Sequence, residues 1–417
     1  MSVITVSGGK KLYGSVSLHG AKNSVLPILA GTVLCPGISV IHNCPALSDV
    51  DAAIKILTHL GAKVDFTEDV VTVDSSNITN FDIPDELMRE MRSSIVFLGA
   101  ILARVGNAVL SSPGGCELGP RPIDLHLSSL CELGMEIDES SGRLNCQCKN
   151  GFCGCEINLS FPSVGATENI ILAAVTAKGT TRINGAAKEP EISDLADFLN
   201  RAGADIHGAG SDIIVINGVK TLHGSEHSLI PDRVEAATYL AAVAATGGKI
   251  EVNNVIPAHL SPVLAILKQA GCGISVSGKH IVLTSCGRLK RVPVIRTLPY
   301  PGFPTDSGSP LLAMFTVADG STMFVENIFE NRFKVVDELK RFGAKINTNG
   351  RVAVIEGVEK LSGASVECTD LRGGGALVIA ALAASGTSKI GKIGHLDRGY
   401  ADLTENLARL GAEIERE

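Results

Sequence analysis

The feature that most constrains this chain is a phrase that recurs six times: Leu, three residues, Gly, two residues, then Val or Ile. It reads LTHLGAKV, LCELGMEI, LNRAGADI, LKQAGCGI, LKRFGAKI and LARLGAEI. Its glycines are Gly61, Gly134, Gly203, Gly271, Gly343 and Gly411, and they are nearly evenly spaced along the chain. Such a phrase is typical of a helix that ends in Leu, a C′ glycine in the left-handed conformation, and then a strand.

A second glycine precedes each of these, at a similar distance in every unit. These glycines are Gly37, Gly106, Gly179, Gly247, Gly320 and Gly386. The apolar run before each, such as VLPILAGTVL or LVIAALAA, has a length and an Ala content that favour a buried helix over a strand. A short strand such as KIEVNN follows. The repeating unit is therefore predicted as helix, strand, loop, helix, strand, with a further strand leading into the next unit.

Six such units in 417 residues are too many for one closed core, and two domains of three units are the economical division. An ordinary doubly wound sheet, the alternative, has no reason to repeat one phrase at near-constant spacing. We expect the N-terminal VITVSGGKKLYGSVSL to supply the leading strand of the first unit. Its close copy IIVINGVKTLHGSEHSL should lead the fourth. The predicted domains are residues 1–20 plus 230–417, and residues 21–229, with an active site in the cleft between them.

Composition limits the class of protein. Hydrophobic residues make up 45% and charged residues 19%, which is typical of a globular protein with a large core. No membrane span or secretory signal is evident, so we expect a cytoplasmic protein with free thiols among its 11 cysteines. A net charge of -7, with no Trp and four Tyr, argues against nucleic-acid binding. A local basic cleft for an anionic substrate remains compatible with that charge, and no oligomer is implied.

One position recurs where the first helix of each unit should begin, always at the same distance before the second glycine. The residues there are Asn23, Arg92, Gly165, Arg233, Asp306 and Arg372. Arg at a helix N-terminus opposes the helix dipole, so the three arginines, with Lys22 alongside, indicate an external anion. A solvated first turn without function is the alternative. Asp306 is a candidate general base or a plain N-cap, and Gly165 would allow a ligand to approach the backbone closely.

The loops before the second helices add more basic residues and a thiol. They read SSPGGCELGPRPIDLH, ENIFENRFK and GHLDRGY, and they contain Cys116, Arg121, Arg332 and Arg398. With the basic residues at the helix starts, these arginines suit a ligand with several phosphate or carboxylate groups. Two glycines precede Cys116, and the nearby Arg121 would favour its thiolate form. An incidental loop thiol is the alternative.

Four further cysteines, Cys146, Cys148, Cys153 and Cys155, lie in NCQCKNGFCGCEI. The Asn150-Gly151 turn signal predicts a hairpin with the four thiols on one face. Zinc binding is one interpretation. The C-x-C spacing is not that of a usual zinc ribbon, and Cys packs readily as a small hydrophobe. Packing is therefore favoured, and no metal site is predicted.

The successive motifs of the chain resemble those of the UDP-N-acetylglucosamine 1-carboxyvinyltransferases nearly from end to end. They are GAKNSVLPILA, MRSSI, PGGCELGPRPIDLH, PSVGATE, EPEISDLADFL, LPYPGFPTD, IFENRF and HLDRGY. The resemblance implies an α/β fold of two inside-out barrel domains with six repeats. It also implies transfer of the enolpyruvyl group of phosphoenolpyruvate to the 3′-hydroxyl of UDP-N-acetylglucosamine, which releases phosphate and commits the sugar to peptidoglycan synthesis. No cofactor is implied.

The same resemblance assigns roles by position. Cys116 matches a general acid that can form a covalent adduct with phosphoenolpyruvate and is alkylated by fosfomycin, and Asp306 matches the base for the sugar hydroxyl. Lys22, a third implied catalytic residue, matches the phosphate side of phosphoenolpyruvate together with Arg121 and Arg398. Arg332 and Arg372 match its carboxylate side. The UDP-sugar positions are Asn23, Arg92, Arg121, Pro122, Ile123, Asp124, Leu125, Ser163, Val164, Gly165, Asp306 and Ile328.

Two departures from the family pattern lie near these residues. After FPTD the family usually continues with Met or Leu, Gln, Ala or Pro, then Gln, whereas this chain has Ser307-Gly308-Ser309-Pro310. Where the family has LRA-x-AAL, this chain has LRGGGAL, and Gly373-Gly374-Gly375 would loosen the helix start that positions Arg372. A catalytically weak UDP-sugar-binding paralogue with a regulatory role is therefore one alternative. A shikimate 3-phosphate enolpyruvyl transferase is another, although that enzyme lacks the Cys loop.

Overall fold

The computed structural model describes residues 2–91, 93–111, 123–139, 143–285 and 288–417. The chain divides into two compact units. Unit 1 contains the described residues of segments 1–19 and 231–417, and unit 2 contains those of segment 20–230. The N-terminal segment therefore belongs to the same unit as the C-terminal half of the chain.

The six-fold repeat is present in the backbone. The glycines of the recurrent phrase all have positive φ, from 89° at Gly343 to 113° at Gly134. The second set of glycines lies between 80° at Gly247 and 100° at Gly37. A residue with a side chain is strained in this region. Each glycine of the recurrent phrase ends a second helix, and each glycine of the second set directly precedes a strand. This part of the prediction is confirmed.

The apolar runs form the first helix of each repeat. These helices are α1 (Lys22–Thr32), α4 (Phe97–Val105), α6 (Val164–Ala174), α8 (Arg233–Thr246), α10 (Gly308–Phe315) and α12 (Leu371–Ala383). The second helices are α2 (Ser48–Leu60), α5 (Asp124–Glu132), α7 (Pro190–Arg201), α9 (Ser261–Gln269), α11 (Val335–Arg341) and α13 (Leu403–Arg409). A short additional helix, α3 (Asp85–Glu90), precedes the second repeat.

The sheets of unit 1 share one strand order, in which a leading strand runs parallel to its neighbour and the other pairs are antiparallel. The first is β2 (Leu12–Ser17), β14 (Gly248–Asn253), β16 (His280–Ser285) and β15 (Gly273–Ser277). The second is β17 (Val294–Arg296), β18 (Ser321–Val325), β20 (Val352–Glu356) and β19 (Lys345–Asn349). The third is β22 (Ser365–Glu367), β24 (Thr387–Gly391), β1 (Ile4–Ser7) and β25 (Glu413–Arg416). A short pair, β21 (Leu361–Ser362) and β23 (Ala384–Ser385), is added.

Unit 2 repeats this order. One sheet is β13 (Glu226–Ser228), β3 (Ile38–His42), β5 (Val70–Asp74) and β4 (Lys63–Thr67). Another is β9 (Glu156–Asn158), β10 (Thr180–Asn184), β12 (Ile213–Asn217) and β11 (Asp205–His207). The third is β6 (Asn107–Ser111), β8 (Arg143–Gln147) and β7 (Glu136–Asp138), with a parallel bridge from Asp82 to Val109 in place of a leading strand.

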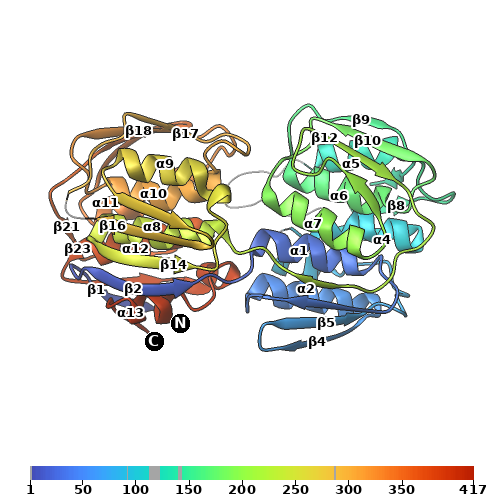
Figure 1. Cartoon of the computed structure of the whole chain (residues 1–417), viewed down its shortest axis with the longest axis horizontal. Helices are drawn as coiled ribbons and strands as arrows, with labels where there is room; N and C mark the ends of the chain where they lie inside the picture. The colour runs from blue at the N-terminus through green and yellow to red at the C-terminus, as the bar shows by residue number, and fades with distance from the viewer. Residues whose placement is uncertain (1, 92, 112–122, 140–142, 286–287) are drawn as a thin grey trace. The chain divides into compact units, whose positions relative to one another are not determined.

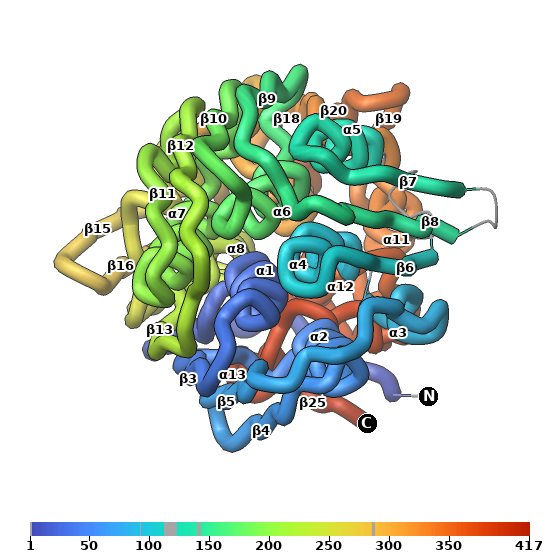
Figure 2. The backbone as a smooth tube through the Cα atoms, turned by 90° about the vertical axis from the view of Figure 1, so that its right-hand side faces the viewer, coloured from blue at the N-terminus to red at the C-terminus, as the bar shows by residue number. Residues whose placement is uncertain are grey.

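The first helices lie inside each unit and the strands lie outside (Figure 1 and Figure 2). In unit 1, α8, α10 and α12 pack against one another, and every residue of α10 is buried. In unit 2, α4 packs against both α1 and α6. This is the inside-out α/β arrangement that the family resemblance implies. No helix of the described residues is both long and apolar enough to span a membrane.

Two sequence predictions are wrong at the level of strand pairing. The N-terminal segment leads the fourth repeat, because β2 runs parallel to β14, and β13 leads the first repeat beside β3. The remaining N-terminal strand, β1, completes the sheet of the sixth repeat. The two segments have nearly the same pattern of residues. Only long-range hydrogen bonds decide which sheet each one joins.

The predicted cysteine hairpin is also wrong. Cys146 lies in β8 and pairs with β6 and β7, whereas Cys153 forms a bridge with Lys178 in the next repeat. The turn at Asn150-Gly151 therefore carries the chain between two sheets. Burial raises the pKa of the Cys146 thiol to about 12, which keeps it protonated. Within the described residues, no group of three or more His, Cys, Asp or Glu side chains is arranged to bind a metal.

A titratable pair lies where the chain leaves unit 1. His19 donates its backbone N–H to Glu235, 3.1 Å away, and its Nδ1 lies 3.1 Å from the same carboxylate. The Glu235 side chain is 4% exposed. The hydrogen bond to Glu235 outweighs burial and raises the pKa of His19 above its ordinary 6.5. The folded chain therefore binds this proton more tightly than the unfolded chain.

We predict that this pair makes unfolding pH-dependent. A raised histidine pKa contributes stability that is fully present below pH 6.5 and is lost as the pH rises through the folded value. His19→Gln should lower the urea-derived stability by about 1 kcal/mol near pH 6 and by less near pH 9. The exposed His223→Gln is the matched control. An equal loss at both pH values would contradict the assignment.

Candidate functional site

The charged cluster of unit 1 centres on Asp306. Its Oδ1 lies 2.6 Å from Nη2 of Arg332, and its Oδ2 lies 3.5 Å from Nη2 of Arg372. Both arginine side chains are only 3% exposed, whereas that of Asp306 is 28% exposed. Two guanidinium groups favour the ionised carboxylate, the form that can accept a proton. The structure thus brings together three of the residues singled out from the sequence.

The ends of three elements position these side chains. Asp306 lies in the short 3-10 turn η3 (Thr305–Ser307) before α10, and Arg332 begins η4 (Arg332–Lys334) before α11. Arg372 is the second residue of α12, whose N-terminus is capped by Asp370. The Asp370 carboxylate accepts hydrogen bonds from the N–H groups of Arg372 and Gly373 at 3.0 and 2.9 Å. The Asp370 carboxylate thus stabilises the partial positive charge at the N-terminus of α12. The Arg372 side chain can therefore contact other groups.

Each buried arginine of this cluster also lies over an aromatic ring. The guanidinium carbon of Arg372 is 5.4 Å from the centre of the Tyr400 ring, and that of Arg332 is 5.5 Å from Phe329. Burial alone would lower the pKa of Arg372, but the combined attraction of Asp306, Tyr400 and Asp232 outweighs it and raises the pKa above its ordinary value. Arg372 therefore keeps its charge. Its Nη1 is buried without a hydrogen-bond partner among the described residues, which leaves it able to bind an anion.

The three glycines after Arg372 do not interrupt α12, which is regular from Leu371 to Ala383. Neighbouring side chains fill the space beside them. A Cβ on Gly374 would lie 2.8 Å from the Leu396 side chain, and a Cβ on Gly375 would lie 2.7 Å from Oη of Tyr400. Tyr400 is buried, and its Oη is 2.9 Å from the Thr238 hydroxyl. The glycine run, which departs from the family pattern, thus leaves space for the Tyr400 ring that lies against the Arg372 guanidinium.

The second departure forms the start of α10. Gly308 begins this helix and Pro310 lies in its first turn. Ser307 and Ser309 are 1% and 2% exposed, and their hydroxyls have no hydrogen-bond partner among the described residues. Asp306 precedes these residues in η3, whose capping position is Pro304. The geometry therefore gives Asp306 ion-pair partners rather than the role of a plain N-cap.

In unit 2, Lys22 is the first residue of α1. Its ammonium nitrogen lies 2.9 Å from Oδ2 of Asp49, and the two side chains are 12% and 1% exposed. Asp49 lies in the first turn of α2. The ion pair fixes Lys22 at the N-terminal end of an inner helix, and Asn23 follows it there. A partly buried cation at the N-terminal end of a helix favours a bound anion.

The start of α6 is fixed by a histidine that the sequence had not singled out. Ser163 caps α6 by accepting a hydrogen bond from the N–H of Ala166. A Cβ on Gly165 would lie 2.8 Å from Cε1 of His126, so only glycine allows this approach. Asn169 donates to Nδ1 of His126 at 2.8 Å, and its carbonyl accepts from the N–H of Gly99 at 2.8 Å. His126 thus connects the start of α5 with the start of α6.

Several predicted residues lie elsewhere. Ile123, Asp124 and Leu125 form the start of α5 in unit 2, next to His126. Ile328 lies in the loop after β18, and Arg398 ends the 3-10 helix η5 (Ile393–Arg398), both in unit 1. Cys116, Arg92, Arg121 and Pro122 lie outside the described residues. Their predicted roles therefore stay predictions.

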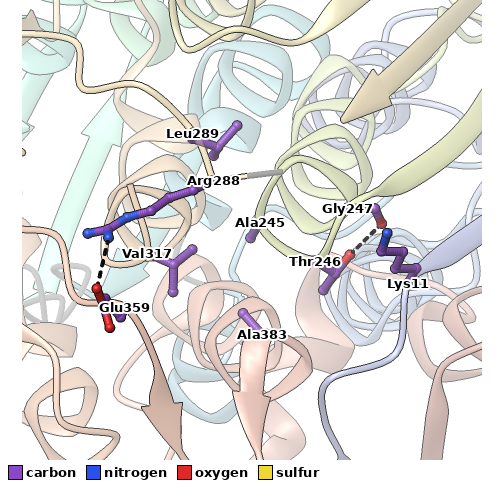
Figure 3. A pocket seen from close by; sticks show the side chains of 9 residues that line it. All are labelled: Lys11, Ala245, Thr246, Gly247, Arg288, Leu289, Val317, Glu359 and Ala383. Carbon is purple, nitrogen blue, oxygen red and sulfur yellow. Dashed lines mark hydrogen bonds and ion pairs between the residues drawn. The ribbon is translucent and has the colours of Figure 1, made fainter. Parts of the chain in front are cut away.

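A cavity of about 230 Å³ lies at the other end of the inner helices of unit 1 (Figure 3). Thr246 and Ala383 line it, and these residues end α8 and α12, whereas Arg372 is at the start of α12. Lys11 and Arg288 also line the cavity, and Arg288 lies 3.9 Å from Glu359. Cations beside helix C-termini stabilise the exposed carbonyl groups. We interpret this cavity as structural and separate from the Asp306 cluster.

Two residues that shape these helix starts were not predicted from the sequence, although both lie in its family motifs. His126 ends RPIDLH, and Tyr400 ends GHLDRGY. Membership of those motifs was the signal that could have found them. What the sequence could not show is that Gly165 faces His126 and Gly375 faces Tyr400, since the members of each pair are far apart along the chain.

Comparison with known proteins identifies relatives along the whole chain. The family model described as EPSP synthase (3-phosphoshikimate 1-carboxyvinyltransferase) matches residues 6–407. UDP-N-acetylglucosamine 1-carboxyvinyltransferase 2 of Caldanaerobacter subterraneus subsp. tengcongensis is 52% identical over 416 residues and covers 100% of both chains. UDP-N-acetylglucosamine 1-carboxyvinyltransferase 1 of Symbiobacterium thermophilum is 50% identical and covers 99% of this chain and 94% of its own.

Solved structures give the same picture of the fold. The enolpyruvyl transferase NikO from Streptomyces tendae superimposes with a TM-score of 0.89 at 26% identity, and covers 100% of this chain and 98% of its own. An EPSP synthase from Acinetobacter baumannii has a TM-score of 0.73 at 19% identity, with full coverage of both chains. The second likeness concerns the fold alone.

We predict that Gly375 is required by the Tyr400 ring. Gly375→Ala should lower the free energy of unfolding by about 1–3 kcal/mol through overpacking, despite the better helix propensity of Ala. Gly308→Ala is the matched control, because a Cβ there meets no atom within 4 Å. It should leave the urea midpoint unchanged or raise it. A Gly375→Ala variant as stable as the control would show that Tyr400 has room to move.

Proposed function

Because this chain belongs to the family of UDP-N-acetylglucosamine 1-carboxyvinyltransferases, we propose that it transfers the enolpyruvyl group of phosphoenolpyruvate to the 3′-hydroxyl of UDP-N-acetylglucosamine. The observation that carries this proposal is the 52% identity to a relative of that name over the full length of both chains. Peptidoglycan synthesis is then the process it serves, and a cytoplasmic location is proposed with it. No specific observation favours the regulatory paralogue or the shikimate 3-phosphate enzyme.

The reaction defines which groups are needed. The sugar hydroxyl bonds to C2 of phosphoenolpyruvate and loses its proton to a base, while C3 gains a proton from an acid. The C2–O bond to phosphate then breaks, C3 loses a proton, and the enol ether forms. Anionic charge must be stabilised on both the phosphate and the carboxylate throughout. A base, an acid and several cations therefore account for the chemistry.

Asp306 is the proposed base. Its partial exposure gives it access to a hydroxyl group, and its two arginine partners favour the ionised form. The same arginines, Arg332 and Arg372, are proposed to bind the substrate carboxylate. Arg372 supports this role with the buried donor Nη1. Substrate binding would then loosen the hold of the arginines on Asp306 and leave it a better proton acceptor.

Lys22, Arg121 and Arg398 are proposed to bind the phosphate of phosphoenolpyruvate. Support for Lys22 comes from its place at the N-terminus of α1, beside Asp49. Cys116 is proposed as the acid that protonates C3. The proposed UDP-sugar positions are Asn23, Arg92, Arg121, Pro122, Ile123, Asp124, Leu125, Ser163, Val164, Gly165, Asp306 and Ile328.

The proposed function is tested by phosphate release from phosphoenolpyruvate with different acceptors. We expect release with UDP-N-acetylglucosamine, and none with shikimate 3-phosphate or without an acceptor. Asp306→Asn should lower kcat by about 10²–10⁴-fold, the usual contribution of a general base. Release with shikimate 3-phosphate, or none with any acceptor from folded protein, would refute the proposal.

A second variant tests the thiol. Cys116→Ser should lower turnover by about 10²–10⁴-fold while UDP-N-acetylglucosamine still binds, because the hydroxyl of Ser is a much weaker acid than the thiol. Calorimetry measures the binding and phosphate release measures the turnover. Cys272→Ser, at a buried thiol in unit 1, is the control. Full activity of the Cys116 variant would remove this residue from the mechanism.

A further inference from the structure

A buried carboxylate close in sequence to Arg332 has no part in the proposed chemistry. Glu326 follows β18 and is 2% exposed. Its Oε1 accepts hydrogen bonds from the N–H groups of Ile328 and Phe329 at 2.7 and 3.0 Å, and from the Thr297 hydroxyl at 2.9 Å. Its Oε2 accepts from the Thr305 hydroxyl at 2.9 Å. All four donors are neutral groups.

The bond to Thr305 reaches the residue next to the proposed base. Thr305 is bound from two sides: Glu326 accepts from its hydroxyl, and its backbone carbonyl accepts from Nε and Nη2 of Arg332 at 3.2 and 2.9 Å. Nη2 of Arg332 also donates to Asp306 at 2.6 Å. The backbone before Asp306 and the carboxylate of Asp306 are therefore fixed by one connected set of hydrogen bonds.

The bonds to the Ile328 and Phe329 amides fix a second segment. Ile328 is one of the proposed UDP-sugar positions, and the Phe329 ring lies 5.5 Å from the guanidinium carbon of Arg332. Thr297, the fourth donor, also accepts a hydrogen bond from the N–H of Asn327 at 2.8 Å. Glu326 thus links the Ile328 loop to the Thr305-Asp306 turn. In the sequence, the whole of α10 and β18 separates these two segments.

We infer that Glu326 is a positioning residue that fixes the proposed base Asp306 and the Ile328 loop in one arrangement; this inference rests on the proposed function. Burying a carboxylate among neutral donors is costly unless every oxygen is satisfied, so such a group is better explained by the geometry it imposes than by stability. Small displacements of a catalytic group lower the rate strongly. Loss of the Glu326 bonds should therefore act through kcat.

The first test compares Glu326→Gln with Glu326→Ala. Gln keeps a carbonyl oxygen for the two amides, and its NH2 can donate to the Thr305 hydroxyl, so kcat should stay within about threefold of the original chain. Ala removes all four bonds, and kcat should fall by about 100-fold, as expected for a displaced catalytic group. If Gln were as inactive as Ala, the charge itself would be the active feature and the positioning role would be overturned.

The second test isolates the bond toward Asp306 and stays informative if the Ala variant does not fold. Thr305→Val keeps the shape but loses the hydroxyl, so kcat should fall about tenfold with the KM for UDP-N-acetylglucosamine nearly unchanged. Thr305→Ser keeps the hydroxyl and should restore kcat. Thr297→Val, which removes a hydroxyl from the same carboxylate on the Ile328 side, should have a smaller effect on kcat. Equal kcat values for Thr305→Val and Thr305→Ser would overturn the inference.

Amide hydrogen exchange of the full chain separates this inference from the proposed function. The Ile328 and Phe329 amides should exchange about tenfold faster in Glu326→Ala than in Glu326→Gln, with or without substrates. If the original chain releases no phosphate, the proposed function fails, while this exchange difference would still support the link made by Glu326. If the original chain is active and the exchange rates are equal, the inference fails alone.

Discussion

Burial of the inner helices is the constraint on which the rest of each unit depends. Helices such as α10 and α12 are buried along almost their whole length, so they need apolar or very small residues on every side. Only their ends remain for polar chemistry. Arg372 and the turn with Asp306 lie at the N-terminal ends. The C-terminal ends line a cavity, where Lys11 and Arg288 lie beside the exposed carbonyl groups. The candidate site therefore lies at the N-terminal ends of these helices, and the structural cavity lies at their C-terminal ends.

The same burial explains the charge pairing of unit 1. A guanidinium that is 3% exposed is costly unless it has partners, and the Asp306 carboxylate together with the Tyr400 and Phe329 rings supplies them. These partners also hold Arg332 and Arg372 in place before any ligand binds. Site preorganisation and structural stability are therefore served by one set of contacts. The glycine run after Arg372 belongs to this set, because it admits the Tyr400 ring.

Much of the fold followed from local chemistry. Glycines at the ends of helices, runs of Ala, Val and Leu, and short strands after them were sufficient to predict the six units and the inner helices. The sequence was sufficient to predict which positions form the candidate site, because Asn23, Gly165, Asp306 and Arg372 occupy the equivalent place in their repeats. The contacts of these positions could not be predicted. The partners of Asp306 come from η4 and α12, which are 26 and 66 residues further along the chain.

The sequence by itself determined the repeat, the helix ends, the types of residue at those ends and the resemblance to a family. These depend on backbone conformation and on local order along the chain, which neighbouring residues decide. The tertiary structure decided which sheet β1, β2 and β13 join, that Cys146 and Cys153 lie in different repeats, and that Glu326 binds the turn before Asp306. Those features depend on hydrogen bonds between distant segments. Two segments with the same alternation of residues satisfy such bonds equally well until the rest of the chain has placed them.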